Sequence, residues 1–354
     1  MIRAAAGKVV RRFPRTTKNS SGYALDAWLR SGDLLDLVIG AEGTLGIVTD
    51  VAWRLDRVPP CRAGLRVTLA SLDALAPAVA ALLPISPSAV ELLDRTFLEL
   101  VGAPGDEAIL LVELERDDEA TLVAATHDAA LAVSPHAGAV ETALTPEDAG
   151  RLWALRHAAS PILAALSDQR RSLQVIEDAC VPVARMGDYV RAVRAAGERY
   201  GIQVVLFGHA GDGHVHVNLL PEVDRPGWEA AVAGLLADVT DTVVRLGGTP
   251  SGEHGDGRLR AGFLEALYGK EIVALFRLVK RAFDPAGLFN PGIVLPSGEP
   301  PLSRLKVGDG ACELPPDIAR ALRDIERQGG YARCRLDLAD ADPVPLTGPA
   351  AIHP

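Results

Sequence analysis

The stretch FGHAGDGHVHVN, residues 207–218, holds three of the chain's eight histidines around a glycine-rich turn. Apolar residues on either side predict two strands, and the glycines let the backbone between them turn sharply and leave room near a bound group. His214 and His216 stand two apart on the second predicted strand, so their side chains share one of its faces. His209 lies across the turn and converges on that face. The stretch therefore predicts a hairpin that gathers imidazole groups.

A second short stretch, SGEHGDG (residues 251–257), adds Glu253 and His254 between glycines. Imidazole and carboxylate groups are the natural ligands of Zn²⁺, Mn²⁺ and Fe²⁺, so the two stretches together predict a divalent metal site. The alternative is a Gly-Asp-Gly turn whose histidines are exposed or satisfied by ordinary hydrogen bonds. The pattern does not choose which two histidines bind. Asp212 is interpreted as a turn residue rather than as a ligand.

Length, charge and cysteine usage exclude several classes of protein. The 354 residues are enough for about two domains. The net charge of −10, with 36 basic and 46 acidic side chains, argues against binding to nucleic acid or anionic lipid. No apolar run has the length of a membrane helix, and the four cysteines form no C-x-x-C pair. We expect a soluble, cytoplasmic protein without a transmembrane segment.

The first 25 residues are basic, with no acidic residue before Asp26. Such a composition is typical of transit peptides. The simpler interpretation rests on residues 8–13, KVVRRF, in which apolar and polar side chains alternate as in a strand. We therefore expect a strand there.

Short predicted strands alternate with predicted helices from Arg62 onward, which indicates an α+β domain with a mostly antiparallel sheet flanked by helices. The expected strands are 46–55, 65–69, 109–115, 139–144, 174–181, 204–209 and 215–219, and residues 89–93 are a short apolar segment. The expected helices are 72–83, 121–132, 146–166, 183–200, 228–246, 270–283 and 316–328.

Two further features carry weaker signals. Residues 40–46, GAEGTLG, are a loop of small residues between two apolar runs, which predicts a strand, a loop and a strand. Such loops allow close approach of a phosphate or a ring, and a tight turn without a ligand is the alternative. Arg156, on a predicted helix, offers a planar fork that pairs with a substrate carboxylate. A solvated helix arginine is the alternative there.

Five motifs follow one another in a fixed order between Lys18 and Pro296. They are KNSSGYALD (18–26), LVIGAEGTLGIVTDVAWRL (37–55), FGHAGDGHVHVN (207–218), GGTPSGEHGDG (247–257) and FDPAGLFNPGIVLP (283–296). This order resembles the FAD-linked oxidases of the vanillyl-alcohol oxidase type. Within them the chain is most similar to the D-lactate, glycolate and D-2-hydroxyglutarate dehydrogenases.

The resemblance implies a division of the chain. Residues 1–56 would form the end of a two-part FAD-binding domain, and residues 57–280 a cap domain built on an antiparallel sheet. Residues 281–296 would return to the FAD domain, and residues 297–354 would be a C-terminal extension. The half of the FAD domain that carries the pyrophosphate-binding glycines is expected to be absent from this chain.

The resemblance also implies roles for particular residues. The metal ligands would be His209, His216 and Glu253, and His254 would be the general base. His214 stands where the family usually has Asn, which adds a competing ligand. The residues expected to hold the substrate are Arg156 and Asn218, and those expected to contact FAD are Gly40, Glu42, Gly43, Gly46, Ile47 and Asn290.

The expected activity is the FAD-dependent oxidation of a small D-2-hydroxy acid to the 2-oxo acid, assisted by a divalent metal (Zn, Mn or Fe). Electrons would pass to a quinone, a cytochrome or an electron-transfer flavoprotein, which would place the chain at the periphery of a membrane where the acceptor requires it. Two alternatives stay open. One is a truncated, non-catalytic remnant that binds metal but not flavin. The other is a metal hydrolase that uses the His/Glu cluster on activated water.

Overall fold

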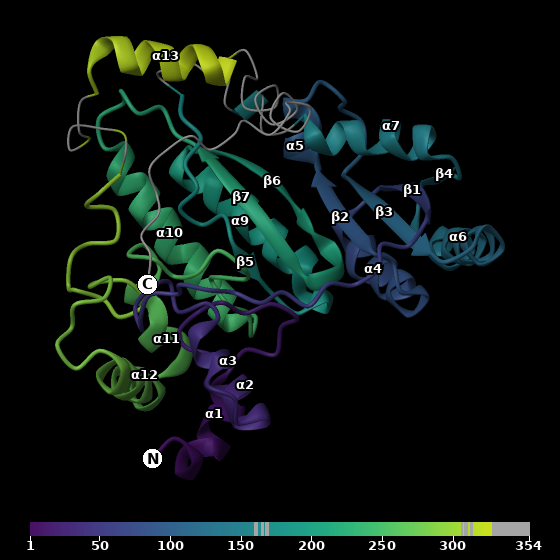
Figure 1. Cartoon of the computed structure of the whole chain (residues 1–354). Coiled ribbons are helices and arrows are strands. Elements are labelled where there is room, and N and C mark those ends of the chain that lie inside the picture. The colour runs from purple at the N-terminus through teal and green to yellow at the C-terminus, as the bar shows by residue number, and fades with distance from the viewer. Residues whose placement is uncertain are drawn as a thin grey trace, which may run out of the picture.

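The computed structural model describes residues 1–158, 162–163, 166, 170–305, 307, 311 and 314–327 (Figure 1). Its centre is a seven-stranded sheet in the order β4-β1-β3-β2-β6-β7-β5, in which every paired neighbour is antiparallel. The strands are β1 (Cys61–Leu69), β2 (Ala89–Asp94), β3 (Ala108–Arg116), β4 (Ala139–Ala143), β5 (Ala179–Cys180), β6 (Gln203–His209) and β7 (His214–Leu220). The predicted α+β class is confirmed.

Helices cover both faces of this sheet because the strand side chains alternate between two apolar cores. The larger core joins one face of the strands to α4 (Leu75–Leu82), α6 (Glu119–Val133), α9 (Met186–Tyr200) and α10 (Trp228–Arg245). The smaller core joins the other face to α5 (Arg95–Leu100) and α7 (Pro146–His157). On β6, for example, Leu206 packs in the larger core and Val205 and Phe207 in the smaller one.

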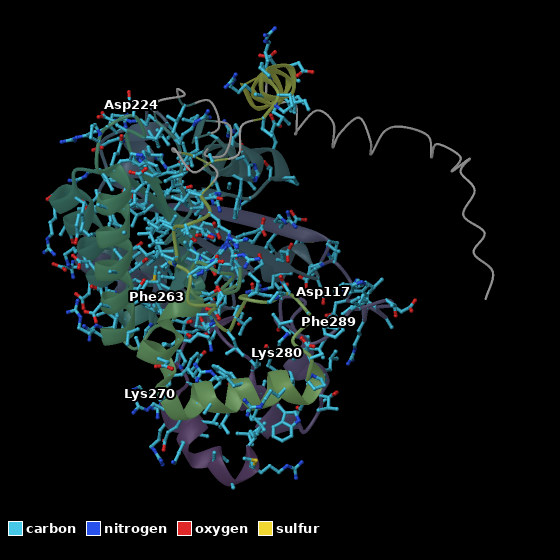
Figure 2. The ribbon with its side chains drawn as sticks, turned by 90° about the vertical axis from the view of Figure 1, so that its left-hand side faces the viewer. Asp117, Asp224, Phe263, Lys270, Lys280 and Phe289 are labelled. Atoms are coloured by element: carbon cyan, nitrogen blue, oxygen red, sulfur yellow. The ribbon has the colours of Figure 1, made fainter. Side chains whose placement is uncertain are left out.

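A separate apolar core lies beside the sheet, where the N-terminal segment of the chain meets a segment that follows α10 (Figure 1). It packs side chains of residues 9–45 against those of residues 264–294. The helices that border it are α1 (Ala6–Arg12), α2 (Leu25–Ser31), α3 (Leu35–Val38), α11 (Leu264–Tyr268) and α12 (Lys270–Phe283). Lys280 of α12 donates hydrogen bonds of 2.6 Å to the carbonyl oxygens of Thr44 and Phe289, which fixes the chain after α12 (Figure 2).

The strand predicted at residues 8–13 is wrong, because residues 8–12 belong to α1 and Phe13 directly follows it. Val9 and Phe13 are buried, whereas Val10 is 64% exposed. Residues four apart share one face of a helix, and only that face meets the core here. The helical spacing of the two buried side chains therefore outweighs the apparent alternation.

The strand predicted at residues 46–55 is also wrong, and so is the one expected before the loop at residue 40, where α3 lies instead. Residues 46–59 form neither helix nor strand, and Ile47, Trp53 and Leu55 are at least 80% exposed. A strand needs a neighbour to take its backbone hydrogen bonds, and no described residue pairs with this segment.

The remaining differences are smaller. Of the strand predicted at 174–181 only Ala179–Cys180 forms, because the residues before it leave the sheet. The helix predicted at 146–166 ends as α7 at His157, and part of its remainder lies outside the described residues. The last predicted helix is α13 (Pro316–Arg327), and residues 328–354 lie outside the described part of the chain. None of the described helices combines the length and the apolar character that crossing a bilayer requires.

Candidate metal centre and active site

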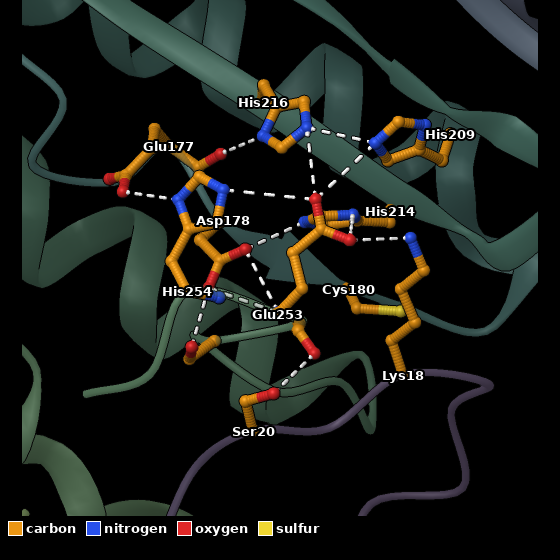
Figure 3. A network of polar contacts seen from close by, with 12 residues as sticks. Lys18, Ser20, Glu177, Asp178, Cys180, His209, His214, His216, Glu253 and His254 are labelled. Carbon is orange, nitrogen blue, oxygen red and sulfur yellow. Dashed lines mark hydrogen bonds and ion pairs between the residues drawn. The ribbon is translucent and has the colours of Figure 1, made fainter. Parts of the chain in front are cut away.

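Three imidazoles and one carboxylate gather at the end of the β6–β7 hairpin (Figure 3). His209 ends β6, His214 and His216 lie on β7, and Glu253 comes from the loop after α10. Nε2 of His209 lies 3.3 Å from Nε2 of His216 and 3.4 Å from Oε1 of Glu253. With bonds of about 2.0–2.1 Å, the ligand atoms of a tetrahedral zinc site are about 3.3 Å apart. The spacing is therefore that of ligands around one ion.

The turn between the two strands depends on a glycine. Gly213 follows the short 3-10 turn Ala210–Asp212 and has a φ of +72°. A Cβ at this position would lie 2.0 Å from the carbonyl oxygen of Val181. No other residue fits there, so Gly213 fixes the path along which His214 enters β7.

Neighbouring oxygens orient two of the imidazoles. Nδ1 of His209 contacts a carboxylate oxygen of Glu91 across the β2–β6 pair, and this hydrogen bond raises the pKa of His209. Nδ1 of His216 donates to the backbone carbonyl of Glu177 at 2.9 Å. Burial lowers the pKa of His216 to about 4. In both rings the hydrogen on Nδ1 leaves a lone pair on Nε2, the atom that faces Glu253.

Asp178 is a buried hub beneath the cluster. Its carboxylate accepts hydrogen bonds from Nε2 of His214 at 2.9 Å, from the hydroxyl of Ser251 and from the backbone N–H of His254 at 2.9 Å. Burial disfavours its ionised form, yet the hydrogen bonds from His214 and Ser251 outweigh burial and lower its pKa to about 2. Asp178 therefore ties the loop that carries Glu253 and His254 to the hairpin.

His254 lies beside the cluster and is accessible, with its side chain 45% exposed. Its Nδ1 lies 3.0 Å from Oε1 of Glu177, and its Nε2 lies 3.8 Å from Oε1 of Glu253. Arg260 donates to the other carboxylate oxygen of Glu177 at 3.1 Å. A hydrogen bond to Glu177 places the hydrogen on Nδ1 and leaves Nε2 as a proton acceptor that faces the metal cluster.

The two residues predicted to hold a substrate lie on the same side of the sheet as the cluster. Arg156 of α7 donates through Nε to Glu91 at 2.8 Å, and its guanidinium lies over the ring of Phe207 at 4.6 Å. Asn218 is buried on β7, on the face that it shares with His216, and its Oδ1 accepts a hydrogen bond from Ser172. Glu91 thus joins Arg156 to His209.

Two of the residues predicted to contact FAD, Glu42 and Asn290, meet beside the core formed by residues 9–45 and 264–294. Asn290 donates to the backbone carbonyl of Glu42 at 2.7 Å. The Glu42 carboxylate accepts the backbone N–H groups of Asp256 and Gly257 at 2.8 and 2.9 Å. Gly40 and Gly43 take positive φ angles, Gly46 is half-buried and Ile47 is exposed. Glu42 therefore connects this edge to the loop of Glu253 and His254.

The sequence motifs do not identify the residues that hold the site together. These residues are Lys18, Glu91, Glu177, Asp178 and Arg260. One signal was present: Glu91 stands in the apolar run AVELLD, and Glu177 and Asp178 stand in VIEDACV. A carboxylate inside a run that will be buried needs a partner, so such acids are candidates for a functional network.

Comparison with known proteins identifies the family. The model of the FAD linked oxidases, C-terminal domain, matches residues 58–294. Glycolate oxidase subunit GlcD of Bacillus subtilis is 31% identical over 297 residues, which are 81% of this chain and 60% of GlcD. The D-lactate dehydrogenase of Archaeoglobus fulgidus is 32% identical over 303 residues, 82% of this chain and 62% of that enzyme. The chain thus spans about three fifths of the length of these relatives.

A solved structure supports the fold. The 4-ethylphenol oxidase of Gulosibacter chungangensis superimposes with a TM-score of 0.53 at 14% identity, over 68% of this chain and 55% of that one. The three histidines of the cluster, Glu253, His254 and Asn290 all lie inside the segment that the family model matches. The resemblance predicted from the five motifs is confirmed, and the chain belongs to the family of FAD-linked oxidases, through their C-terminal domain.

Proposed function

We propose that this chain takes part in the oxidation of a D-2-hydroxy acid to the 2-oxo acid, with FAD and a divalent metal. The observation that carries this proposal is the cluster of potential metal ligands, His209, His216 and Glu253, next to the accessible His254. The chain that holds this cluster belongs to the FAD-linked oxidase family. Glycolate and D-lactate, which appear in the names of two relatives, are both 2-hydroxy acids. Family membership favours this function over hydrolysis at the same cluster.

The donor set supports a metal at this position. Two imidazole nitrogens with free lone pairs and one carboxylate oxygen lie 3.3 to 3.7 Å apart. These are ligands that zinc, manganese and ferrous iron accept. When bound, the metal supplies a Lewis acid for the substrate hydroxyl, and FAD supplies the hydride acceptor. Lys18 holds Oε2 of Glu253 at 2.7 Å, which leaves Oε1 for the ion.

His254 would take the hydroxyl proton. The imidazole accepts it at Nε2, and the carboxylate of Glu177, 3.0 Å from Nδ1, stabilises the imidazolium that results. Arg260 holds the Glu177 carboxylate in place through a hydrogen bond of 3.1 Å. A base held in this way needs no rearrangement before it receives the proton.

Arg156 and Asn218 would hold the substrate carboxylate and orient the hydroxyl toward His254. Arg156 pairs with carboxylates through a planar fork, and Glu91 fixes its Nε, so the outer nitrogens have a defined direction. Asn218 is buried beside the cluster and offers an amide N–H group while Ser172 occupies its oxygen. These two residues give the site its preference for an acid.

Residues 40–47 and Asn290 would hold FAD. In this proposal the core of residues 1–45 and 264–294 belongs to the flavin-binding side, and the seven-stranded sheet forms the cap. The electron acceptor would be a quinone, a cytochrome or an electron-transfer flavoprotein, and the chain would act in the cytoplasm or at a membrane surface.

One observation favours a second function. Residues 46–59 expose Ile47, Trp53 and Leu55, so the predicted flavin-binding side has apolar surface that no described residue covers. A chain that binds metal at the histidine cluster but does not retain FAD would have this property. Retention of flavin by the purified chain separates the two functions.

The experiment is a product assay on the full chain. The protein is loaded with FAD and with Zn²⁺, Mn²⁺ or Fe²⁺, and 2-oxo acid formation is followed with an artificial electron acceptor. D-lactate, glycolate and D-2-hydroxyglutarate are tested against L-lactate. We expect product from at least one of the first three, dependence on added metal, and loss of product in His254→Gln but not in the exposed control His127→Gln. Flavin retention without product from any acid would contradict the proposal.

A further inference from the structure

His214 has one ring nitrogen with a hydrogen-bond partner and one without. Nε2 lies 2.9 Å from Oδ1 of Asp178, and because a carboxylate only accepts, this nitrogen carries the hydrogen. Nδ1 is buried, and no described residue forms a hydrogen bond with it. Buried polar atoms in folded proteins are nearly always paired. We therefore expect the lone pair on Nδ1 to bind a group that is not among the described side chains.

The surroundings of Nδ1 indicate what that partner is. Nδ1 lies 3.8 Å from Oε2 of Glu253, and one potential ligand atom from each of His209, His214, His216 and Glu253 lies within 4.8 Å of the other three (Figure 3). The Nε2 atoms of His209 and His216 are 3.3 Å apart, and both carry lone pairs because each ring donates through Nδ1. In the neutral tautomers that donate through Nδ1, these two Nε2 atoms have no hydrogen to share, and a cation between them would remove the repulsion of their lone pairs.

We propose that His214 is a fourth protein ligand, which binds the metal ion through Nδ1. This inference rests on the metal site of the proposed function and adds to it a donor that the three-ligand arrangement lacks. The resulting set is three imidazoles and one carboxylate oxygen. Zinc accepts four protein ligands of these types, and because catalytic zinc can expand to five-coordinate, a fifth position remains for the substrate hydroxyl of the proposed function; manganese favours sites with more oxygen.

The groups around His214 are those that a metal-binding histidine requires. Asp178 accepts the hydrogen from its second nitrogen, which fixes the ring and makes Nδ1 a stronger donor. The ring is fully buried, so the surrounding side chains prevent it from rotating to another orientation. Asp178 also accepts the backbone N–H of Glu253 at 3.2 Å, so one carboxylate positions two of the four ligands.

The test is the zinc affinity of His214→Gln, measured on the full chain by competition with a chromophoric chelator, without flavin or substrate. Glutamine places an amide nitrogen near the position of Nε2, which keeps the contact with Asp178 and removes the donor at Nδ1. We expect the affinity to fall by about 100-fold or more, beyond the loss of about 10–100-fold that is typical of outer-shell changes. His127→Gln, the same substitution on the exposed face of α6, should bind zinc as the wild type does.

A second measurement keeps the result independent of stability. X-ray absorption at the zinc edge should show three imidazoles in the wild type and two in His214→Gln, with circular dichroism confirming that both are folded. Two imidazoles in the wild type, or an affinity of His214→Gln equal to that of the wild type, would overturn the inference. If His214→Gln bound zinc normally but His209→Ala did not, the proposed metal site would be supported and only the role of His214 as a ligand would be rejected. If both variants bound zinc normally, the metal site and the role of His214 would both be rejected.

Discussion

Oε1 of Glu177 lies 3.0 Å from Nδ1 of His254. The backbone carbonyl of the same glutamate accepts a hydrogen from Nδ1 of His216 at 2.9 Å. One residue therefore fixes the tautomer of the proposed base and of a proposed metal ligand. The proposed base and the proposed metal ligand are thus held in a fixed relation to one another, which the proposed proton transfer would require.

Removal of the base should separate catalysis from cofactor binding. In His254→Gln we expect the turnover number to fall by about 10²–10⁴-fold, the usual contribution of a general base. Metal and flavin content should not change, because His254 is not among the proposed ligands. Single-turnover kinetics and metal analysis of the same preparation test this. A rate near that of the wild type would remove His254 from the mechanism.

Removal of a metal ligand should instead reduce the metal content and, with it, the activity. In His216→Ala the zinc affinity should fall by about 100-fold or more, with activity lost in proportion to the metal. His127→Ala, on an exposed helix face, is the matched control. Metal content after dialysis measures the effect. Full occupancy in folded His216→Ala would show that the ion lies elsewhere.

The turn at Gly213 should tolerate no side chain. Gly213→Ala places a methyl group against the carbonyl of Val181 at a positive φ, so we expect a loss of more than about 2 kcal/mol of stability and a weaker metal site. Gly262→Ala is the control, because a Cβ there meets no atom within 4 Å. Thermal unfolding compares the two. Equal melting temperatures would mean that the turn is not constrained as described.

Asp256 should make stability depend on pH. Burial raises its pKa from 3.8 to about 7, so the folded chain holds the proton more tightly than the unfolded chain. The resulting stabilisation is complete below about pH 4 and is lost as the pH rises through 7. A difference of about three between the two pKa values corresponds to roughly 4 kcal/mol.

Asp256→Asn removes the titrating group and keeps an oxygen for the N–H of Gly22, which Asp256 accepts at 2.7 Å. The variant should therefore lose less stability than the wild type between pH 4 and pH 8. Denaturant unfolding at several pH values gives the difference between the two proteins, in which other titrating groups cancel. Parallel profiles would contradict the burial of an uncompensated carboxyl at this position.

Local pattern was sufficient for most of the sheet. β6 and β7 are predicted by the apolar residues on either side of a glycine turn. Alternate residues of β6 pack in the larger and the smaller core. Val9 and Phe13 show the limit. Their spacing of four residues is that of a helix, but KVVRRF also alternates, and only the position of the core decides between the two. No strand forms at residues 46–55, because strand formation requires backbone pairing with a segment that is distant in the sequence, and the local pattern does not show whether such a segment is present.

The candidate site divides in the same way. His209, His216 and Glu253 were identified from residue type and motif, and the structure brings them together. Glu91, Glu177 and Asp178 are not identified by the sequence motifs, because their partners His209, His254 and His214 lie 118, 77 and 36 positions away in the sequence. Contacts at that separation follow from the fold and not from any local pattern.

The most direct test of the central claim is the visible absorbance of flavin in the full chain. The protein is loaded with FAD and zinc, desalted, and mixed without oxygen with D-lactate, glycolate or D-2-hydroxyglutarate. We expect that one of these acids bleaches the flavin, that one equivalent of 2-oxo acid forms, and that a chelator prevents both. A chain that retains FAD and zinc, but whose flavin stays oxidised with every acid, would contradict the account.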